Sequence, residues 1–295
     1  IDAIIGLPAN IFFGTGIPTI IMVLRKNKRD SDVLIIDASK GFEKDGKNNK
    51  LRACDIKRIV DAYKERPEKI EKFARRVSRA EIVQNDYNLN IPRYVDSSEK
   101  AESWDIYASM FGGIPEAELQ DLSAYWTAFP HLKAALFSPD NEAYCRLNVA
   151  NLKNAVLFHP DVVAFKTAFQ NAFGDFDAYL KSALIDGMTQ LNAAGEEERL
   201  SREIFARLAG IPLVDRYAAY QLLDDDWKKI AIDLEIIQTE GFAATKQVDP
   251  NMVLKKDAEV QDGWVGHVLP FELVQSVKMH EEVAALRAKE TRLAE

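Results

Sequence analysis

Three apolar runs near the N-terminus decide the expected fold: Ile1-Asp-Ala-Ile-Ile-Gly-Leu7, Ile17-Pro-Thr-Ile-Ile-Met-Val-Leu24 and Asp32-Val-Leu-Ile-Ile-Asp37. None of them alternates apolar with polar residues, which is typical of strands buried on both faces of an α/β sheet. The link Phe12-Phe-Gly-Thr-Gly16 predicts a hairpin-type turn. Because the first strand begins at residue 1 without a Met, we expect a fragment whose remaining strands lie upstream.

Apolar residues at helical spacing dominate the rest of the chain. A helix is predicted over 55–66 between a capping Asp55 and Pro67, another over 68–77, and an extended segment over 81–96. Further helices are predicted over 99–111, 116–127, 160–172, 174–191, 198–209, 213–220, 224–239 and 270–294. The expected fold class is an α/β remnant, the last strands of a larger sheet, followed by a mostly α-helical domain, and mainly α overall. The boundary is placed between 1–97 and 98–295.

Composition excludes several classes of protein. The chain has 295 residues, 47% of them hydrophobic and 28% charged, which indicates a globular core rather than disorder. Pro18 interrupts the longest apolar run, so we expect no membrane span and no membrane partner. The start lacks the pattern of a signal peptide. Only Cys54 and Cys145 are present, far apart, which favours a reducing cytoplasm over a disulfide scaffold.

Charge is distributed unevenly behind the net value of −8. Residues 1–100 carry 20 Lys and Arg against 15 Asp and Glu, whereas residues 101–295 carry 18 against 31. This asymmetry indicates two surfaces with different partners, and ordinary solvated helix faces are the alternative interpretation.

The sequence contains no complete catalytic, nucleotide-binding or metal-binding motif. The sequence has no P-loop, no Gly-x-Ser-x-Gly elbow and no metal-ligand spacing among its four scattered His residues, so no metal site is expected. Gly14-Thr15-Gly16 lacks the third Gly of a dinucleotide fingerprint and is interpreted as a turn. Cys54 lies near Lys57 and Arg58, which lower a thiol pKa, but a buried structural thiol is favoured. We therefore predict no catalytic residue in this chain from its motifs.

Three strings carry a resemblance to a known family: Gly6-Leu-Pro-Ala-Asn-Ile-Phe-Phe-Gly-Thr-Gly-Ile-Pro-Thr19 with its continuation to Lys28, Ile35-Ile-Asp-Ala-Ser-Lys40, and Asn85-Asp-Tyr-Asn-Leu-Asn-Ile-Pro-Arg-Tyr-Val-Asp96. In this order they resemble the C-terminal part of the modification (M) subunit of type I restriction-modification systems. That subunit is an S-adenosyl-L-methionine-dependent adenine-N6 DNA methyltransferase. The resemblance covers roughly residues 1–96 and implies that the strands end a methyltransferase-type sheet.

The resemblance also exposes a gap. The family binds its methyl donor with an Asp-Pro-Ala-x-Gly-Ser-Gly type loop and the flipped adenine with an Asn-Pro-Pro-Tyr/Phe motif, and neither is present here. Both lie upstream in the family. The resemblance therefore implies that the full-length protein uses S-adenosyl-L-methionine, whereas this fragment holds no cofactor and is inactive by itself.

Several site residues follow from the resemblance. Phe12 or Phe13 corresponds to the place where such enzymes put a residue near the flipped base of double-stranded DNA; closing the sheet edge is the alternative. Two basic clusters are candidates for DNA phosphate contacts, with solvated surface as the alternative: Arg25, Lys26, Lys28 and Arg29, and then Arg75, Arg76 and Arg79.

The acidic helical part suits protein partners. In the family, M subunits dock on a specificity (S) subunit, and a restriction (R) subunit joins the complex. A helix over 270–294 is the predicted docking element, with packing on its own domain as the alternative; its apolar stripe is Phe271, Val274, Val277, Val283, Leu286 and Leu293. Two rival interpretations remain: a stand-alone helical interaction module unrelated to methylation, and an enzyme whose site the sequence does not reveal.

Overall fold

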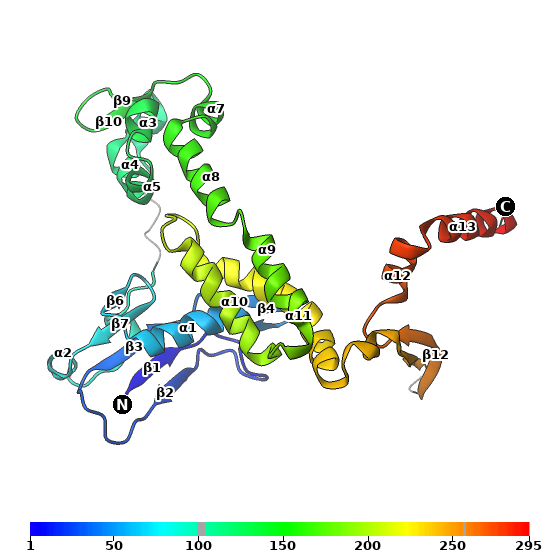
Figure 1. Ribbon diagram of the computed structural model, residues 1–295. Coiled ribbons are helices and arrows are strands. Elements are labelled where there is room, and N and C mark those ends of the chain that lie inside the picture. Colours follow the sequence, from blue (N-terminus) through cyan, green and yellow to red (C-terminus); the bar gives the residue numbers. More distant parts are fainter. Residues whose placement is uncertain (99–103, 256–257, 295) are drawn as a thin grey trace. The chain divides into compact units, whose positions relative to one another are not determined.

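The computed structural model describes residues 1–98, 104–255 and 258–294 (Figure 1). Helices make up about 51% of the structure, and the sheets are small, which confirms the mainly helical composition. The chain divides into two compact units. One consists of Ile1–Ala172 with Ile204–Asp224, and the other of Phe173–Glu203 with Asp225–Glu295.

A five-stranded sheet contains the three N-terminal apolar runs. Its order is β2-β1-β3-β7-β6, with β1 at Ala3–Gly6, β2 at Ile20–Val23, β3 at Val33–Asp37, β6 at Lys69–Ile70 and β7 at Ala74–Val77. β1 and β3 are parallel, whereas β2 and β7 run antiparallel to their neighbours. The prediction of three strands is confirmed. Burial on both faces holds for β1 and β3 but is wrong for β2, because β2 is an edge strand with exposed apolar residues.

Both faces of this sheet are covered. On one face Ile5 and Ile36 pack with Ile59 and Ala62 of α1, which spans Ala53–Glu65. On the other face the alternate residues Ile4 and Ile35 pack against α2 (Arg79–Gln84) and the 3₁₀ turn η1 (Ile91–Arg93). Successive side chains of a strand point to opposite faces, so unbroken apolar runs are what this arrangement needs.

Three local predictions in this region are corrected. The segment 68–77, predicted as a helix, forms β6 and β7, because pairing of β7 with β3 overrides the local helical propensity. The segment 81–96, predicted as extended, contains most of α2 and all of η1. Ser78 caps the start of α2, because its Oγ accepts from the N–H of Glu81. Asp55 is the third residue of α1 and closes a capping box with Arg52, rather than being the first cap.

The hairpin of β4 (Glu43–Asp45) and β5 (Asn48–Lys50) was not predicted from the sequence. Residues 104–172 form a mixed region around Phe129, Leu132, Leu136 and Val162, with a small sheet of order β8-β10-β9. Its elements are α3 (Ile106–Phe111), β8 (Ile114–Pro115), α4 (Glu116–Asp121), α5 (Ser123–Ala128), α6 (Leu132–Leu136), β9 (Phe137–Pro139), β10 (Tyr144–Leu147), α7 (Leu152–Leu157) and α8 (Pro160–Ala172).

The helix predicted over 160–172 is confirmed, whereas that over 116–127 is divided at Leu122. Of the range 99–111, residues 99–103 lie outside the described part, and α3 forms the remainder.

The C-terminal half contains longer helices and a second hairpin. The elements are α9 (Phe176–Leu180), η2 (Lys181–Asp186), η3 (Met188–Gln190), α10 (Ala193–Leu208), α11 (Arg216–Glu240), η4 (Phe242–Lys246), β11 (Val248–Lys255), β12 (Ala258–Gly266), α12 (Phe271–Lys278) and α13 (His280–Ala294). The predictions 213–220 and 224–239 merge into the single helix α11.

The helix predicted over 270–294 is two helices, broken at Met279, whose backbone leaves the helical region. Among the described residues, none of the helices combines the length and apolar content that crossing a bilayer requires.

Candidate functional site

The three resemblance strings meet around one cavity of about 470 Å³. Gly6, Leu7 and Thr19 line it from the first string, Asp37 and Ser39 from the second, and 89–92 from the third. A Cβ on Gly6 would lie 2.6 Å from Ile91 Cδ1, so the first and third strings approach each other as closely as Gly allows. The cavity lies where the parallel strands β1 and β3 end, the usual position of ligand sites in α/β sheets.

The cavity wall is mostly apolar with few polar groups. Thr19 Oγ1 is buried there without a hydrogen-bond partner within the described part of the chain. Asp37 is buried, and its carboxylate accepts from the N–H of Ser39 at 3.0 Å and from the Oγ of Ser97 at 2.5 Å. An apolar wall with a few hydrogen-bonding groups is typical of small-molecule binding sites.

The loop from Pro8 to Thr19 joins β1 to β2 and borders this cavity. The N–H of Leu7 bonds to the carbonyl of Thr19 at 2.8 Å and closes the loop at its base. Asn49 of β5 anchors the loop from the other side, with its N–H on the carbonyl of Asn10 at 2.8 Å and its Nδ2 on the carbonyl of Ala9 at 2.7 Å. The anchoring role of Asn49 had no signal in the sequence, because the hairpin that carries it was not predicted.

The two aromatic residues of the loop project into solvent. Phe13 is 97% exposed and Phe12 is 55% exposed. Gly14 has a φ of 79°, a conformation that lets the chain turn directly after the second ring. An anchored loop that presents exposed rings leaves their faces available for stacking.

The first basic cluster surrounds a buried carboxylate. Asp2 is fully buried and accepts from Tyr63 Oη at 2.8 Å and Arg66 Nη1 at 3.1 Å. Arg25 Nη2 lies 3.3 Å and Lys28 Nζ 3.5 Å from the same carboxylate. Burial alone would raise the pKa of Asp2, but the Tyr63 hydrogen bond and the three cations outweigh it and lower that pKa.

The second basic cluster is also partly paired. Arg75 makes two hydrogen bonds to the carboxylate of Glu81, at 2.8 and 2.9 Å, and Arg76 pairs with Glu68. The remaining residues of the two clusters are exposed and form no ion pair in the part of the chain that the structure describes: Lys26, Arg29 and Arg79. The structure thus separates the predicted phosphate contacts into a paired group and an available group.

The predicted docking stripe lies on α12 and α13. Val277 is 68% exposed and Leu286 is 59% exposed, whereas Val283 is half-buried. Phe271 and Val274 are exposed to a smaller extent. Leu293 belongs to α13, but its side chain lies outside the described part. The break at Met279 means that these residues do not form one continuous stripe.

Two further groups have shifted pKa values. Burial is the main cause that raises the pKa of the Cys54 thiol, which agrees with a structural rather than a reactive cysteine. His267 Nδ1 lies 2.6 Å from Asp249 and its Nε2 lies 3.4 Å from Glu240. The hydrogen bond to Asp249 is the main cause that raises the pKa of His267.

Comparison with known proteins gives these features a context. A family model described as N-6 DNA Methylase matches residues 1–103. This segment is similar to the N-6 DNA methylase family. It covers all three strings and the whole five-stranded sheet, and the resemblance stated from the sequence is thereby confirmed.

Individual relatives agree with the family. The chain is 39% identical over 107 residues to the type I restriction enzyme MpnII methylase subunit of Mycoplasma pneumoniae, a match that covers 36% of this chain and 20% of the relative. It is 44% identical over 112 residues to the MjaVII methylase subunit of Methanocaldococcus jannaschii, over 36% of this chain and 19% of the relative.

A solved structure of the type I restriction-modification system methyltransferase subunit from Streptococcus thermophilus matches 33% of this chain and 20% of that chain at 55% identity, with a TM-score of 0.32. The chain therefore spans about a fifth of the length of the curated relatives that it matches.

Proposed function

We propose that this methylase-family chain is the C-terminal part of the M subunit of a type I restriction-modification system. Its residues 1–97 would supply the last strands of the methyltransferase sheet, and residues 98–295 would assemble with the specificity subunit. The proposal rests on the family match over residues 1–103, in which the three sequence strings of the resemblance line a single cavity.

The edge strand β2 supports the view that more of the sheet precedes this segment. Ile20, Ile21 and Met22 are all exposed on a strand whose second edge is unpaired within the described residues. Natural proteins seldom leave an apolar edge strand uncovered, because it invites pairing with other chains. A strand from the upstream part of the same polypeptide would cover it.

The anchored loop supports a role at the target base. In the complete enzyme, S-adenosyl-L-methionine would donate a methyl group to adenine N6 in double-stranded DNA, and this chain would contribute Phe12 or Phe13 as a stacking surface. Base–aromatic stacking contributes about 1–3 kcal/mol per base. The exposure of Phe13 leaves its ring free to make this contact.

Contacts to DNA phosphates would come from the exposed cations of the two basic clusters that form no ion pair within the described residues: Lys26, Arg29 and Arg79. Arg25 and Lys28 share the carboxylate of Asp2 with Arg66, and Arg75 and Arg76 pair with Glu81 and Glu68, so these four side chains are already engaged within the chain. Contacts of this kind position DNA without reading its sequence.

The acidic remainder of the chain fits a protein partner better than DNA, whose phosphates would repel it. The exposed apolar residues Val277 and Leu286 on α12 and α13 are the proposed contacts to the specificity subunit. In the complete complex a restriction subunit would join this assembly in the cytoplasm.

Light scattering of the chain mixed with its cognate specificity subunit tests the proposal. We expect a complex that Val277→Glu and Leu286→Glu weaken, because a carboxylate would be desolvated in the interface. Ile106→Glu is the matched control, since Ile106 is 72% exposed on α3. Absence of a complex with a folded chain would contradict the docking role and favour a stand-alone interaction module.

A further inference from the structure

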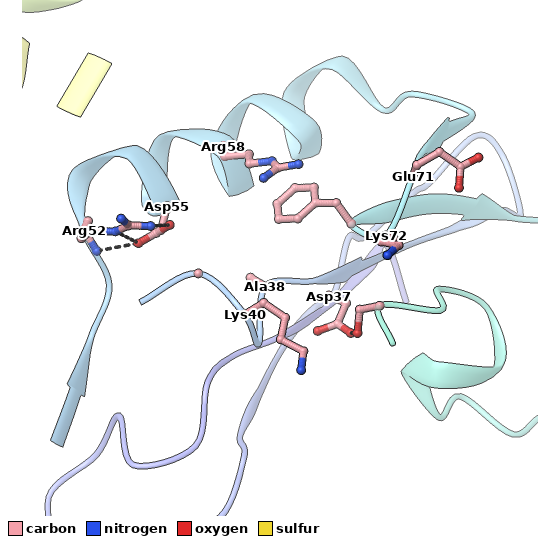
Figure 2. Close-up of a pocket in the computed structure, with 11 residues that line it drawn as sticks. Asp37, Ala38, Lys40, Arg52, Asp55, Arg58, Glu71 and Lys72 are labelled. Carbon is pink, nitrogen blue, oxygen red and sulfur yellow. Dashed lines mark hydrogen bonds and ion pairs between the residues drawn. The ribbon is translucent and has the colours of Figure 1, made fainter. Parts of the chain in front are cut away.

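A second cavity, of about 460 Å³, lies beside the sheet on the side of α1 (Figure 2). Lys40 lines it from the segment after β3, Arg58 from α1 and Lys72 from the β6–β7 turn; in Figure 2 the ammonium group of Lys40 points away from Arg58. The proposed function gives none of these three residues a role. They belong to different segments of the chain, so their charges share a cavity only in the folded protein.

The acidic residues that line this cavity are already satisfied. Asp55 binds Arg52 through both oxygens, at 2.9 and 3.0 Å, and also accepts the N–H of Arg52. Glu71 pairs with Lys69 at 2.6 Å. Asp37 is the remaining carboxylate, and its oxygens accept from Ser39 and Ser97.

The cations, by contrast, are not balanced. Within residues 1–98, 104–255 and 258–294, the structure shows no ion pair for Lys40, Arg58 or Lys72. The lining as a whole carries four cations, the fourth being Arg52, against the three carboxylates of Asp37, Asp55 and Glu71, and Lys72 also attracts the nearby carboxylate of Asp96. A cavity with a local excess of positive charge attracts anions.

The guanidinium of Arg58 lies over an aromatic ring. Its guanidinium carbon lies 4.1 Å from the centroid of the Phe73 ring, and Phe73 is itself buried in the core. Stacking on a ring leaves the N–H groups in the guanidinium plane free to donate sideways. Such a planar set of donors matches two oxygens of a phosphate group.

Lys72 is placed by an unusual turn. The N–H of Phe73 bonds to the carbonyl of Ile70 at 3.1 Å, and Lys72 has a φ of 56° at the third position of this turn. That conformation favours Gly, so Lys at this position is not explained by the turn itself. Its side chain adds a positive charge to the wall of the cavity.

We propose that this cavity binds a phosphate group, with Arg58 as the bidentate donor and Lys40 and Lys72 as charge partners. The phosphate would belong either to a free phosphate-bearing molecule or to a nucleic-acid backbone. Both sources present the same oxygens to the same three side chains. The proposal does not depend on docking to a specificity subunit.

Equilibrium dialysis of the full chain against radiolabelled inorganic phosphate tests the proposal. We expect saturable binding that Arg58→Gln weakens by about tenfold or more, because it removes a charge-assisted bidentate contact. Lys64→Gln is the matched control, since Lys64 is exposed on the same helix and lies outside the cavity lining. Lys72→Gly keeps the experiment informative if Arg58→Gln unfolds, because Gly favours the observed φ.

A short DNA duplex distinguishes the two sources. If Arg58→Gln and Lys72→Gly weaken both phosphate and DNA binding, the site holds a backbone phosphate. If they weaken phosphate binding alone, it holds a free phosphate-bearing molecule. The proposal is overturned if the wild-type chain shows no saturable phosphate binding, or if both variants bind phosphate as tightly as Lys64→Gln.

Discussion

Replacing Asp2 with Asn should destabilise the N-terminal sheet strongly. The substitution leaves the half-buried Arg66 and Lys28 without their buried counter-charge. Removing one partner of a buried ion pair costs about 3–5 kcal/mol. Asn keeps an oxygen for the Tyr63 hydroxyl, and Arg25 is half exposed, so we expect the lower end, about 3 kcal/mol. The backbone bonds of Asp2 to Val23 and Leu34 remain.

Hydrogen exchange measured by mass spectrometry reports on this change locally. The four Trp residues lie at 104, 126, 227 and 264, so Trp fluorescence does not report on the sheet within 1–98. A loss of about 3 kcal/mol should lower protection of the β1 and β3 amides roughly 100-fold if they exchange through unfolding of the sheet. Peptides of the β11–β12 hairpin should be unchanged.

Asp30→Asn is the control, because Asp30 pairs with Lys28 at 3.1 Å but is itself exposed. Surface pairs of this kind contribute roughly 0–1 kcal/mol. Equal protection in the Asp2 and Asp30 variants would show that the buried ion pairs of Asp2 do not stabilise the sheet. Because the pKa of Asp2 is lowered, its stabilisation is present above its ordinary pKa of about 4 and is lost as the pH falls through the lowered value.

Three further predictions concern other parts of the chain. Phe13→Ala should leave thermal stability unchanged, because the Phe13 ring is exposed. The same substitution should weaken binding of an oligonucleotide that contains 2-aminopurine by about 1–3 kcal/mol, measured by the fluorescence of the 2-aminopurine. Gly6→Ala should cost about 1 kcal/mol, measured by exchange of β1, because its new methyl group would press on the movable end of Ile91; Gly187→Ala, with open space around it, is the control. Charged His267 should stabilise the β11–β12 hairpin below its ordinary pKa near 6.5, and this stabilisation should be lost as the pH rises through its raised pKa. Hydrogen exchange of the hairpin amides, measured at acidic and at alkaline pH, should show this pH dependence. The variant His267→Gln should abolish the pH dependence.

The sequence revealed the N-terminal strands because both faces of β1 and β3 are buried, which requires unbroken apolar runs. The same architecture explains the error over 68–77. Ala74 and Val77 are three residues apart, a spacing that resembles a helix face. In the structure they belong to a strand and pack on opposite faces of a sheet covered on both sides. Local spacing does not distinguish these two cases.

The candidate site was also predicted only in part, because local motifs show in the sequence and long-range contacts do not. The motif strings identified the loop with Phe12 and Phe13, but the charge pattern did not show that Asp2 draws Arg25 and Lys28 together, because their contacts cross tens of residues. Asn49 and the phosphate cavity were missed because both depend on tertiary neighbours. The sequence at the break at Met279 contains neither Gly nor Pro, so no helix-breaking residue predicts it.

The decisive experiment is methyl transfer in a reconstituted mixture. The chain would be combined with the polypeptide that precedes it in the M subunit, the specificity subunit, target DNA and tritiated S-adenosyl-L-methionine. We expect incorporation into DNA only when this chain is present, and reduced incorporation with Phe13→Ala. Equal incorporation without the chain would contradict the claim that its sheet and loop complete the methyltransferase.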